Sequence, residues 1–259
     1  MTGEVLAPLR ARYAYWLGLD DDEVLVDREE AAGDIRALQL LLRMERDRPP
    51  SWHTALAMAA TGSAAICLDP RSEPDGEWYE AVRDYCAGHI RKVTRRGRGA
   101  QWEATAVLPG ITMTDGDTEV RALVPGRVQD LDKRVAKLQV GGTDVEPDEV
   151  AARPADNALL IYLPPAPIMT LGKAMAQTGH AGMIAAALLA GDQPRLQAWL
   201  DAGLPSAVRR ATVDQWTELA RATADDGRAW TGERLLAVRD AGFTEVAPGT
   251  ITAIARAGW

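Results

Sequence analysis

The feature that most constrains this chain is an internal repeat. The segments 55–64 and 172–181 agree at six of ten positions, at an offset of 117 residues (172 − 55). Ala87-Gly88 matches Ala202-Gly203 at an offset of 115, and Gln101-Trp102 matches Gln215-Trp216 at an offset of 114. A duplicated unit predicts a nearly constant offset of this kind, and chance similarity between two α/β units is the alternative. We therefore expect the 259 residues to form two copies of one unit.

The apolar runs and helix signals alternate in both copies, which predicts an α/β fold. Strands are expected at 38–42, 90–94, 119–124, 135–140, 158–163, 207–211, 235–239 and 250–255. Helices are expected from the N-cap Ser51 to about 68, over 77–87, from the N-cap Thr170 to about 190, and over 192–202 and 213–223. These elements divide the chain into a loosely held N-terminal extension (1–36), a first domain (37–142), a polar linker (143–156) and a second domain (157–259).

The charge is distributed unevenly between the copies. The chain has 29 basic and 37 acidic residues and a net charge of -8. Residues 1–150 contain 19 basic and 27 acidic residues, whereas residues 151–259 contain 10 of each. This net charge is unlike that of a nucleic-acid-binding protein, which is typically basic. The whole excess of acidic over basic residues, however, lies in residues 1–150.

Several classes of protein are not indicated. Two cysteines cannot form a disulfide framework or a four-cysteine zinc site, and the three histidines are too scattered for a zinc motif. No dinucleotide fingerprint, phosphate-binding loop or nucleophile elbow is found, so no cofactor and no metal are expected. No apolar stretch has the length of a signal peptide or a membrane span. A cytoplasmic location without membrane contact is expected.

Three polar residues in the second copy lie on one face of a predicted helix. Lys173, Gln177 and His180 have the spacing i, i+4 and i+7. The aligned residues of the first copy are small or apolar: Leu56, Ala60 and Ser63. The first copy thus retains the packing residues but lacks the polar, reactive side chains, which indicates that it serves as a scaffold. A solvated stripe that includes a core histidine is the alternative.

Lys173 and Asp240 are the charged candidates in the second copy. A lysine in the first helical turn, beside Gly172, opposes the helix dipole, so an anion contact accounts for it better. Asp240 follows the strand 235–239, and strand carboxyl ends are the usual ligand sites of α/β sheets. We align it with the stretch 123–126 of the first copy, which lacks a carboxylate. An Asx-turn role is the alternative for Asp240.

A run of five cations lies in the first copy. A solvated edge strand and a contact to a phosphate backbone both account for it. Its members are Arg91, Lys92, Arg95, Arg96 and Arg98.

The second copy resembles the type II peptidyl-tRNA hydrolases. Residues 172–181 (GKAMAQTGHA) are similar to the family's Gly-Lys-x-x-x-Gln-x-x-His-Ala helix start. Residues 240–250 (DAGFTEVAPGT) are close to its Asp-Ala-Gly-x-Thr-x-x-x-Pro-Gly-Thr ending. The resemblance covers about 158 to 257, and the stretch 196–223 matches only in pattern.

The resemblance implies a three-layer α/β/α fold with a mixed four-stranded sheet. It also implies cleavage of the ester between a peptide and the 3′ end of tRNA. The catalytic candidates are Lys173, Asp240 and Thr244, with Gln177 and His180 nearby. The substrate-binding candidates are Gly172, Arg209, Arg210, Pro248, Gly249 and Thr250.

The extra copy departs from the family, whose members are typically homodimers. We expect the degenerate copy to take the second subunit's place in an intramolecular pseudo-dimer, so that the chain can be a monomer that binds peptidyl-tRNA. A non-catalytic module that binds tRNA or a protein, and a hydrolase of another ester or acylated nucleotide, are the alternatives.

Overall fold

Two largely apolar strands, β1 (Arg36–Arg43) and β6 (Leu159–Leu163), each lie inside a mixed sheet. They belong to a computed structural model that describes residues 2–16, 30–148, 154–240 and 245–259. Within these residues, the first sheet has the order β2-β1-β4-β3, with β5 paired to β1, and the second has the order β7-β6-β9-β8. The other strands are β2 (Arg91–Gly97), β3 (Gly110–Asp115), β4 (Thr118–Leu123), β5 (Gly126–Arg127), β7 (Ser206–Arg210), β8 (Leu235–Arg239) and β9 (Ile251–Arg256).

The two sheets share their strand directions as well as their order. β1 runs parallel to β2 and antiparallel to β4, which is antiparallel to β3. β6 runs parallel to β7 and antiparallel to β9, which is antiparallel to β8. By position in the sheet, β1, β2, β3 and β4 therefore correspond to β6, β7, β8 and β9. The second half has the mixed four-stranded sheet that was expected, whereas the sheet of the first half has the additional short strand β5.

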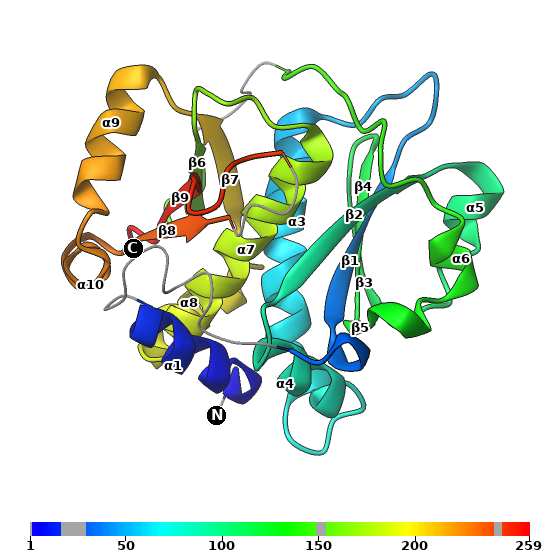
Figure 1. Ribbon diagram of the computed structural model, residues 1–259, viewed down its shortest axis with the longest axis horizontal. Helices are drawn as coiled ribbons and strands as arrows, with labels where there is room; N and C mark the ends of the chain where they lie inside the picture. The colour runs from blue at the N-terminus through cyan, green and yellow to red at the C-terminus, as the bar shows by residue number, and fades with distance from the viewer. Residues whose placement is uncertain (1, 17–29, 149–153, 241–244) are drawn as a thin grey trace.

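Two long helices, α3 (Trp52–Leu68) and α7 (Leu171–Leu189), lie side by side between the sheets (Figure 1). Both begin at the N-caps that the sequence predicts, because the Ser51 side chain accepts from Thr54 N and the Thr170 side chain accepts from Lys173 N. The two helices approach closely at Gly182, where a Cβ atom would lie 2.3 Å from the Ala60 carbonyl oxygen. One continuous core therefore joins residues of both halves.

Shorter helices cover the outer face of each sheet (Figure 1). On the first sheet, Trp102 and Val135 pack on Leu41. On the second sheet, Trp216 packs in the cluster that contains Leu235. Each sheet thus has helices on both faces, as the α/β prediction requires. The helices not yet given are α1 (Ala7–Trp16), α4 (Tyr79–Cys86), α5 (Gly99–Glu103), α6 (Lys133–Ala136), α8 (Gln193–Asp201), α9 (Val213–Ala222), α10 (Asp226–Arg228) and the π-helix η5 (Ala229–Glu233). No helix of the described residues has the length and apolar character needed to cross a membrane.

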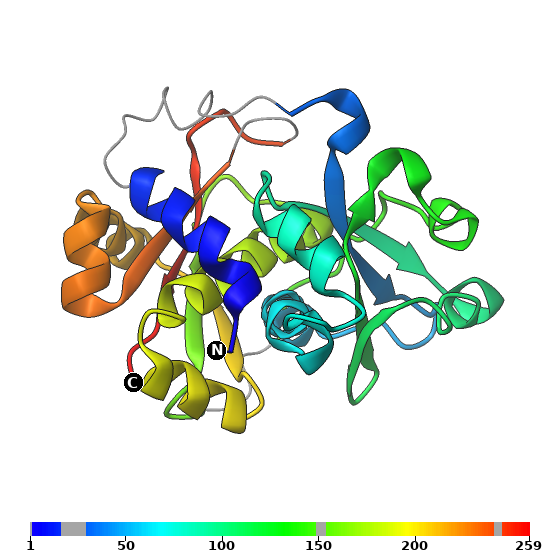
Figure 2. The same cartoon turned by 90° about the horizontal axis from the view of Figure 1, so that it is seen from below.

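Residues 2–16, the first described part of the N-terminal extension, are not loosely held, contrary to expectation. Leu6 and Leu9 are fully buried in the common core, and the Tyr13 hydroxyl donates to the carbonyl oxygen of Ala237 in β8. Figure 2 shows α1 crossing the side of the molecule beside α4 and α7. The apolar side chains at 5, 6, 9 and 13 have helical spacing, and the acidic run that follows them concealed this signal. That run, residues 20–23, lies outside the described residues.

The expected strand at 135–140 is wrong, because the chain forms α6 there. The Asp132 side chain accepts from Arg134 N and begins a helical turn that buries Val135 and Leu138 on one side. The sequence analysis missed β3, since this edge strand is mostly exposed and has little apolar pattern. The described parts of the expected linker, 143–148 and 154–156, contain no helix or strand. Thr143 in this segment is nevertheless buried and accepts from Gly172 N.

Candidate functional site

Lys173 and Gln177 project from one face of α7 toward Asp240, which directly follows β8. Gln177 Nε2 donates to Asp240 Oδ2 at 2.7 Å, and Lys173 Nζ forms an ion pair with the same oxygen. Asp240 is 8% exposed and the Lys173 side chain is 11% exposed. The i, i+4 spacing thus places an ammonium group and an amide on one carboxylate oxygen. A carboxylate held in this way can orient water or accept a proton at the edge of the sheet.

A threonine that the sequence analysis did not consider holds Gln177 in place. Thr252 of β9 is 1% exposed, and its hydroxyl lies 2.5 Å from Gln177 Oε1 and 3.2 Å from the Val238 carbonyl oxygen. Because the hydroxyl donates to Oε1, the amide turns its Nε2 donor toward Asp240. The signal for Thr252 was weak, since one polar residue in an apolar strand usually binds backbone.

The backbone of Asp240 is held by the predicted substrate-binding residues Gly249 and Thr250. Asp240 N donates to Thr250 O at 3.0 Å, and Gly249 N donates to Asp240 O at 2.8 Å. Gly249 has a φ of +77°, a conformation that favours glycine. These two residues therefore close the loop on which Asp240 sits. Pro248 is exposed in the same loop, and the catalytic candidate Thr244 lies outside the described residues.

The N-terminus of α7 is occupied by groups of the protein itself. Glu245 accepts from both the amide and the hydroxyl of Thr170. Gly172 N donates to the Thr143 hydroxyl, and Lys173 N donates to the Thr170 hydroxyl. These contacts satisfy backbone donors that an anion would otherwise take. Lys173 does contact an anion, but that anion is Asp240.

His180 points away from this cluster, although it lies on the same helix face. Its Nδ1 is 3.5 Å from Nζ of Lys92, a residue of β2 in the first half. Seven residues along a helix span about 10 Å, so the i+7 side chain meets a different neighbour. Burial, together with the charges of Lys92 and Lys173, holds the pKa of His180 well below its usual value. A role for His180 beside Asp240 is therefore not what the geometry favours.

Lys92 lies between the halves in surroundings that disfavour its charge. Its Nζ is 3.2 Å from the Tyr85 hydroxyl, 3.3 Å from the Ile90 carbonyl oxygen and 3.5 Å from Met183 Sδ. Burial lowers the pKa of Lys92 to about 7, and none of the described groups that contact its Nζ is a carboxylate. The unfolded chain then binds more protons than the folded chain between pH 7 and about pH 10.5.

The wild-type protein is therefore expected to gain stability as the pH rises from 7 to 9. The Lys92→Met variant, which has no charge at this position, should lack this gain. The free energy of unfolding of the variant should exceed that of the wild type by the largest amount at pH 6 to 7. This difference should be smaller by about 2 kcal/mol at pH 9. Urea denaturation of both proteins at each pH measures the difference. A difference that stays constant with pH would contradict the assignment.

The cation run of the first half does not form one cationic surface. Side chains alternate along β2, so Lys92 turns inward while its neighbours face other partners. Arg91 pairs with Glu30, Arg95 donates to Gln39, and Arg96 donates to the Gly141 carbonyl oxygen. Arg98 is exposed at the start of α5. The expected phosphate-contact patch is thus divided among structural contacts.

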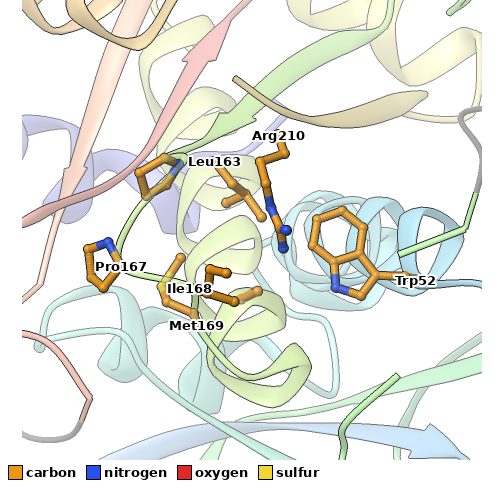
Figure 3. A pocket seen from close by; sticks show the side chains of 8 residues that line it. Trp52, Leu163, Pro167, Ile168, Met169 and Arg210 are labelled. Atoms are coloured by element: carbon orange, nitrogen blue, oxygen red, sulfur yellow. The ribbon is translucent and has the colours of Figure 1, made fainter. Parts of the chain in front are cut away.

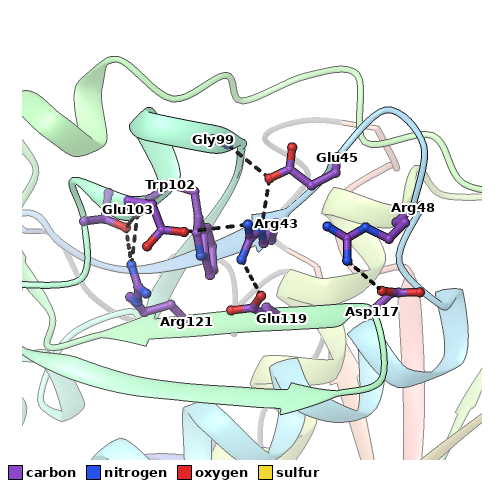
Figure 4. A network of polar contacts seen from close by, with 10 residues as sticks. Arg43, Glu45, Arg48, Gly99, Trp102, Glu103, Asp117, Glu119 and Arg121 are labelled. Carbon is purple, nitrogen blue, oxygen red and sulfur yellow. Dashed lines mark hydrogen bonds and ion pairs between the residues drawn. The ribbon is translucent and has the colours of Figure 1, made fainter.

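The end of β1 in the first half carries a group of ion pairs (Figure 4). Arg43, at the end of β1, pairs with Glu45 and Glu119, and Glu45 also accepts from Gly99 N. Our alignment of Asp240 with 123–126 was wrong, because the strand that corresponds to β8 is β3. β3 turns directly into β4 at Gly116-Asp117, without the ten-residue connection that follows Asp240 in the second half.

Arg209 and Arg210 end β7 at the same edge of the second sheet. Arg209 donates to the Val208 carbonyl oxygen, and the Arg210 guanidinium lies 5.2 Å from the centre of the Trp52 ring. Arg210 and Trp52 line an open pocket beside the start of α7 (Figure 3). Within the described residues, no group of three or more His, Cys, Asp or Glu side chains is arranged to hold a metal ion.

The fold and this cluster define an α/β domain with a lysine, a carboxylate and an amide joined at a strand end. Residues 167–257 match the family model of the peptidyl-tRNA hydrolase PTH2 proteins, so the C-terminal part of the chain is similar to that family. No curated protein matches the chain. The match supports a hydrolase of the peptidyl-tRNA hydrolase kind and does not include the N-terminal half.

Proposed function

We propose that the C-terminal half hydrolyses the ester that joins a peptide, or an N-blocked aminoacyl group, to the 3′ end of tRNA. The observation that carries the proposal is the convergence of Lys173 and Gln177 on Asp240 Oδ2. These three residues come from the two motifs that the family shares, which are more than 60 residues apart in the sequence.

Ester hydrolysis needs an attacking water, a proton acceptor and stabilisation of the developing oxyanion. In the proposed reaction Asp240 orients the water and accepts its proton while the water oxygen bonds to the carbonyl carbon. Lys173 supplies positive charge to the oxyanion. The bond to the ribose oxygen then breaks, and the proton passes from Asp240 to that oxygen to give a free tRNA end and a peptide carboxylic acid, which releases its own proton to solvent. Thr244 relays the proton by analogy with the family.

Purified protein should cleave N-acetyl-aminoacyl-tRNA and leave a simple aryl ester, such as p-nitrophenyl acetate, nearly untouched. Release of labelled N-acetyl amino acid measures the first reaction. Cleavage of both substrates at similar kcat/KM would indicate a hydrolase with another substrate. RNA binding without any turnover would favour the non-catalytic module and would refute the proposal.

Thr252 gives a test of how the site is oriented. The variant Thr252→Val keeps the side-chain shape but removes the donor to Gln177 Oε1, so the amide can turn its oxygen toward Asp240. We expect kcat/KM for N-acetyl-aminoacyl-tRNA to fall about tenfold, with the activity restored by Thr252→Ser. Thr223→Val is a matched control, because Thr223 is also buried and its hydroxyl donates only within the C-terminal end of α9. Equal activity of the Thr252 and Thr223 valine variants would contradict the role.

We further propose that the halves are copies of one unit and pack as an intramolecular pseudo-dimer. The common strand order supports this, as does a reciprocal packing in which α7 contacts β2 and α3 contacts β7. Two residues support it independently. Ile90 and Leu204, at an offset of 114, precede β2 and β7 and have φ values of +47° and +57°. Non-glycine residues rarely adopt this conformation, so its recurrence at matched positions favours common descent.

A further inference from the structure

The open pocket at the carboxyl ends of β6 and β7 has walls from both halves of the chain (Figure 3). It is a shallow depression in the surface that is open to solvent. Arg210 extends from β7 between Trp52 of α3 on one side and Pro167, Ile168 and Met169 on the other. Trp52 belongs to the N-terminal half, so this wall is absent from the C-terminal domain alone.

The pocket combines a cation with an exposed apolar surface. Ile168 is 73% exposed, although its neighbour Met169 is buried. Trp52 is 3% exposed and lies 5.2 Å beneath the Arg210 guanidinium, which it can orient by a cation–π contact. Among the described residues, no carboxylate lies within ion-pair distance of Arg210. A guanidinium that is stacked on an aromatic ring and not paired to an acid is suited to bind a phosphate group.

The pocket also adjoins the candidate catalytic residues. Its lining includes Ala174, the residue after Lys173 in α7. The apolar wall runs directly into Thr170, whose amide and hydroxyl bind Glu245 in the loop after Asp240. A ligand in the pocket would therefore lie beside the first turn of α7, from which Lys173 reaches Asp240.

We propose that this pocket binds the unpaired 3′-terminal nucleotides of tRNA, with a phosphate on Arg210 and a base against Ile168 and Pro167. This proposal rests on the proposed function, and the 3′-terminal nucleotides are the part of the substrate that this surface would bind. Apolar surface beside a cation is typical of single-strand binding, where a base covers the apolar side chains and the backbone meets the charge. The N-terminal half contributes through Trp52, which holds the Arg210 guanidinium toward the pocket.

The test is the binding of a fluorescent RNA hairpin that ends in an unpaired CCA sequence, measured by anisotropy. Arg210→Ala should weaken binding about tenfold and reduce the slope of log affinity against log salt by about one. Arg210→Lys should be intermediate, because lysine keeps the charge without the planar stacking group. Ile168→Ser should weaken binding about threefold, since less apolar surface is covered. Arg221→Ala is the matched control, as Arg221 is exposed on α9 away from the pocket.

The same hairpin without its unpaired end separates a subsite from general charge attraction. The pocket predicts that Arg210→Ala has little effect on this second RNA. Equal losses for both RNAs, or equal affinities of the Arg210→Ala and Arg221→Ala variants, would overturn the proposal. Unchanged RNA affinity with turnover that depends on the amino-acid side chain would assign the pocket to the peptide and would also overturn it. Wild-type protein that binds the CCA end without turnover would refute the proposed reaction and leave the pocket standing.

Discussion

Replacing Asp240 by Asn is expected to lower kcat/KM for N-acetyl-aminoacyl-tRNA by about a thousandfold or more, and Lys173→Met should do the same. The asparagine removes the proton acceptor, and the methionine removes the charge that faces the oxyanion. The Lys173 ammonium and the Asp240 carboxylate form one ion pair. The double variant should therefore be about as inactive as either single variant, because losses within one catalytic unit are not additive. Single-turnover release of labelled N-acetyl amino acid measures all three proteins.

Folding must be followed in the same variants, because each leaves a mostly buried partner without its counterion. Loss of one member of a buried pair typically costs about 3 kcal/mol, so the melting temperature is expected to fall. Asp201→Asn is a control at an exposed carboxylate, which accepts from Gln197 on α8, and should retain full activity. A folded Asp240→Asn protein with more than about a tenth of wild-type activity would place the chemistry elsewhere.

Gly182→Ala is expected to destabilise the protein by about 3 kcal/mol, although alanine ordinarily favours a helix over glycine by about 1 kcal/mol. The added Cβ would lie 2.3 Å from the Ala60 carbonyl oxygen, so the backbones of α3 and α7 must separate. The continuous core between the halves would then lose contacts along both helices. Thermal and urea denaturation give the change in the free energy of unfolding.

Gly232→Ala provides the control for this substitution, since nothing lies within 4 Å of a Cβ atom at Gly232 and its φ is not positive. That variant should differ from wild type by less than about 0.5 kcal/mol. A pseudo-dimer also predicts that wild-type protein sediments as a single chain of 27.9 kDa. A Gly182→Ala protein as stable as the Gly232→Ala control, or a stable particle of two chains, would contradict the proposed packing.

Helix starts and buried strands could be predicted from the sequence where residues close together in the chain determine them. Ser51 and Thr170 begin α3 and α7 as predicted, because a capping hydroxyl acts on backbone donors within the same turn. The apolar run at 38–42 is confirmed as β1, since a fully buried strand needs apolar side chains on both faces. Errors arose where the pattern was short or mixed, as at the predicted strand 135–140, where Asp132 caps the helix α6 just before the run.

In the candidate site, too, some features were predicted from neighbouring residues and others depended on distant parts of the chain. Lys173, Gln177 and Asp240 were predicted to act together, and the structure brings them together, while their catalytic role stays a prediction. His180 shares their helix face yet meets Lys92, because the identity of its neighbour depends on the other half of the chain. The sequence signal for Thr252 was weak and Trp52 carried none, since each becomes relevant through a residue more than 70 positions away.

By itself, the sequence determined the α/β class, most of the helices and strands, and the likeness of the C-terminal part to a known family, because these depend on local pattern and on motifs of adjacent residues. The tertiary structure alone decided how the halves meet, which groups occupy the start of α7 and which wall faces Arg210. These features depend on distances between segments that are far apart in the sequence. Such distances are set by close packing of the whole core, for which no single stretch of residues carries the information.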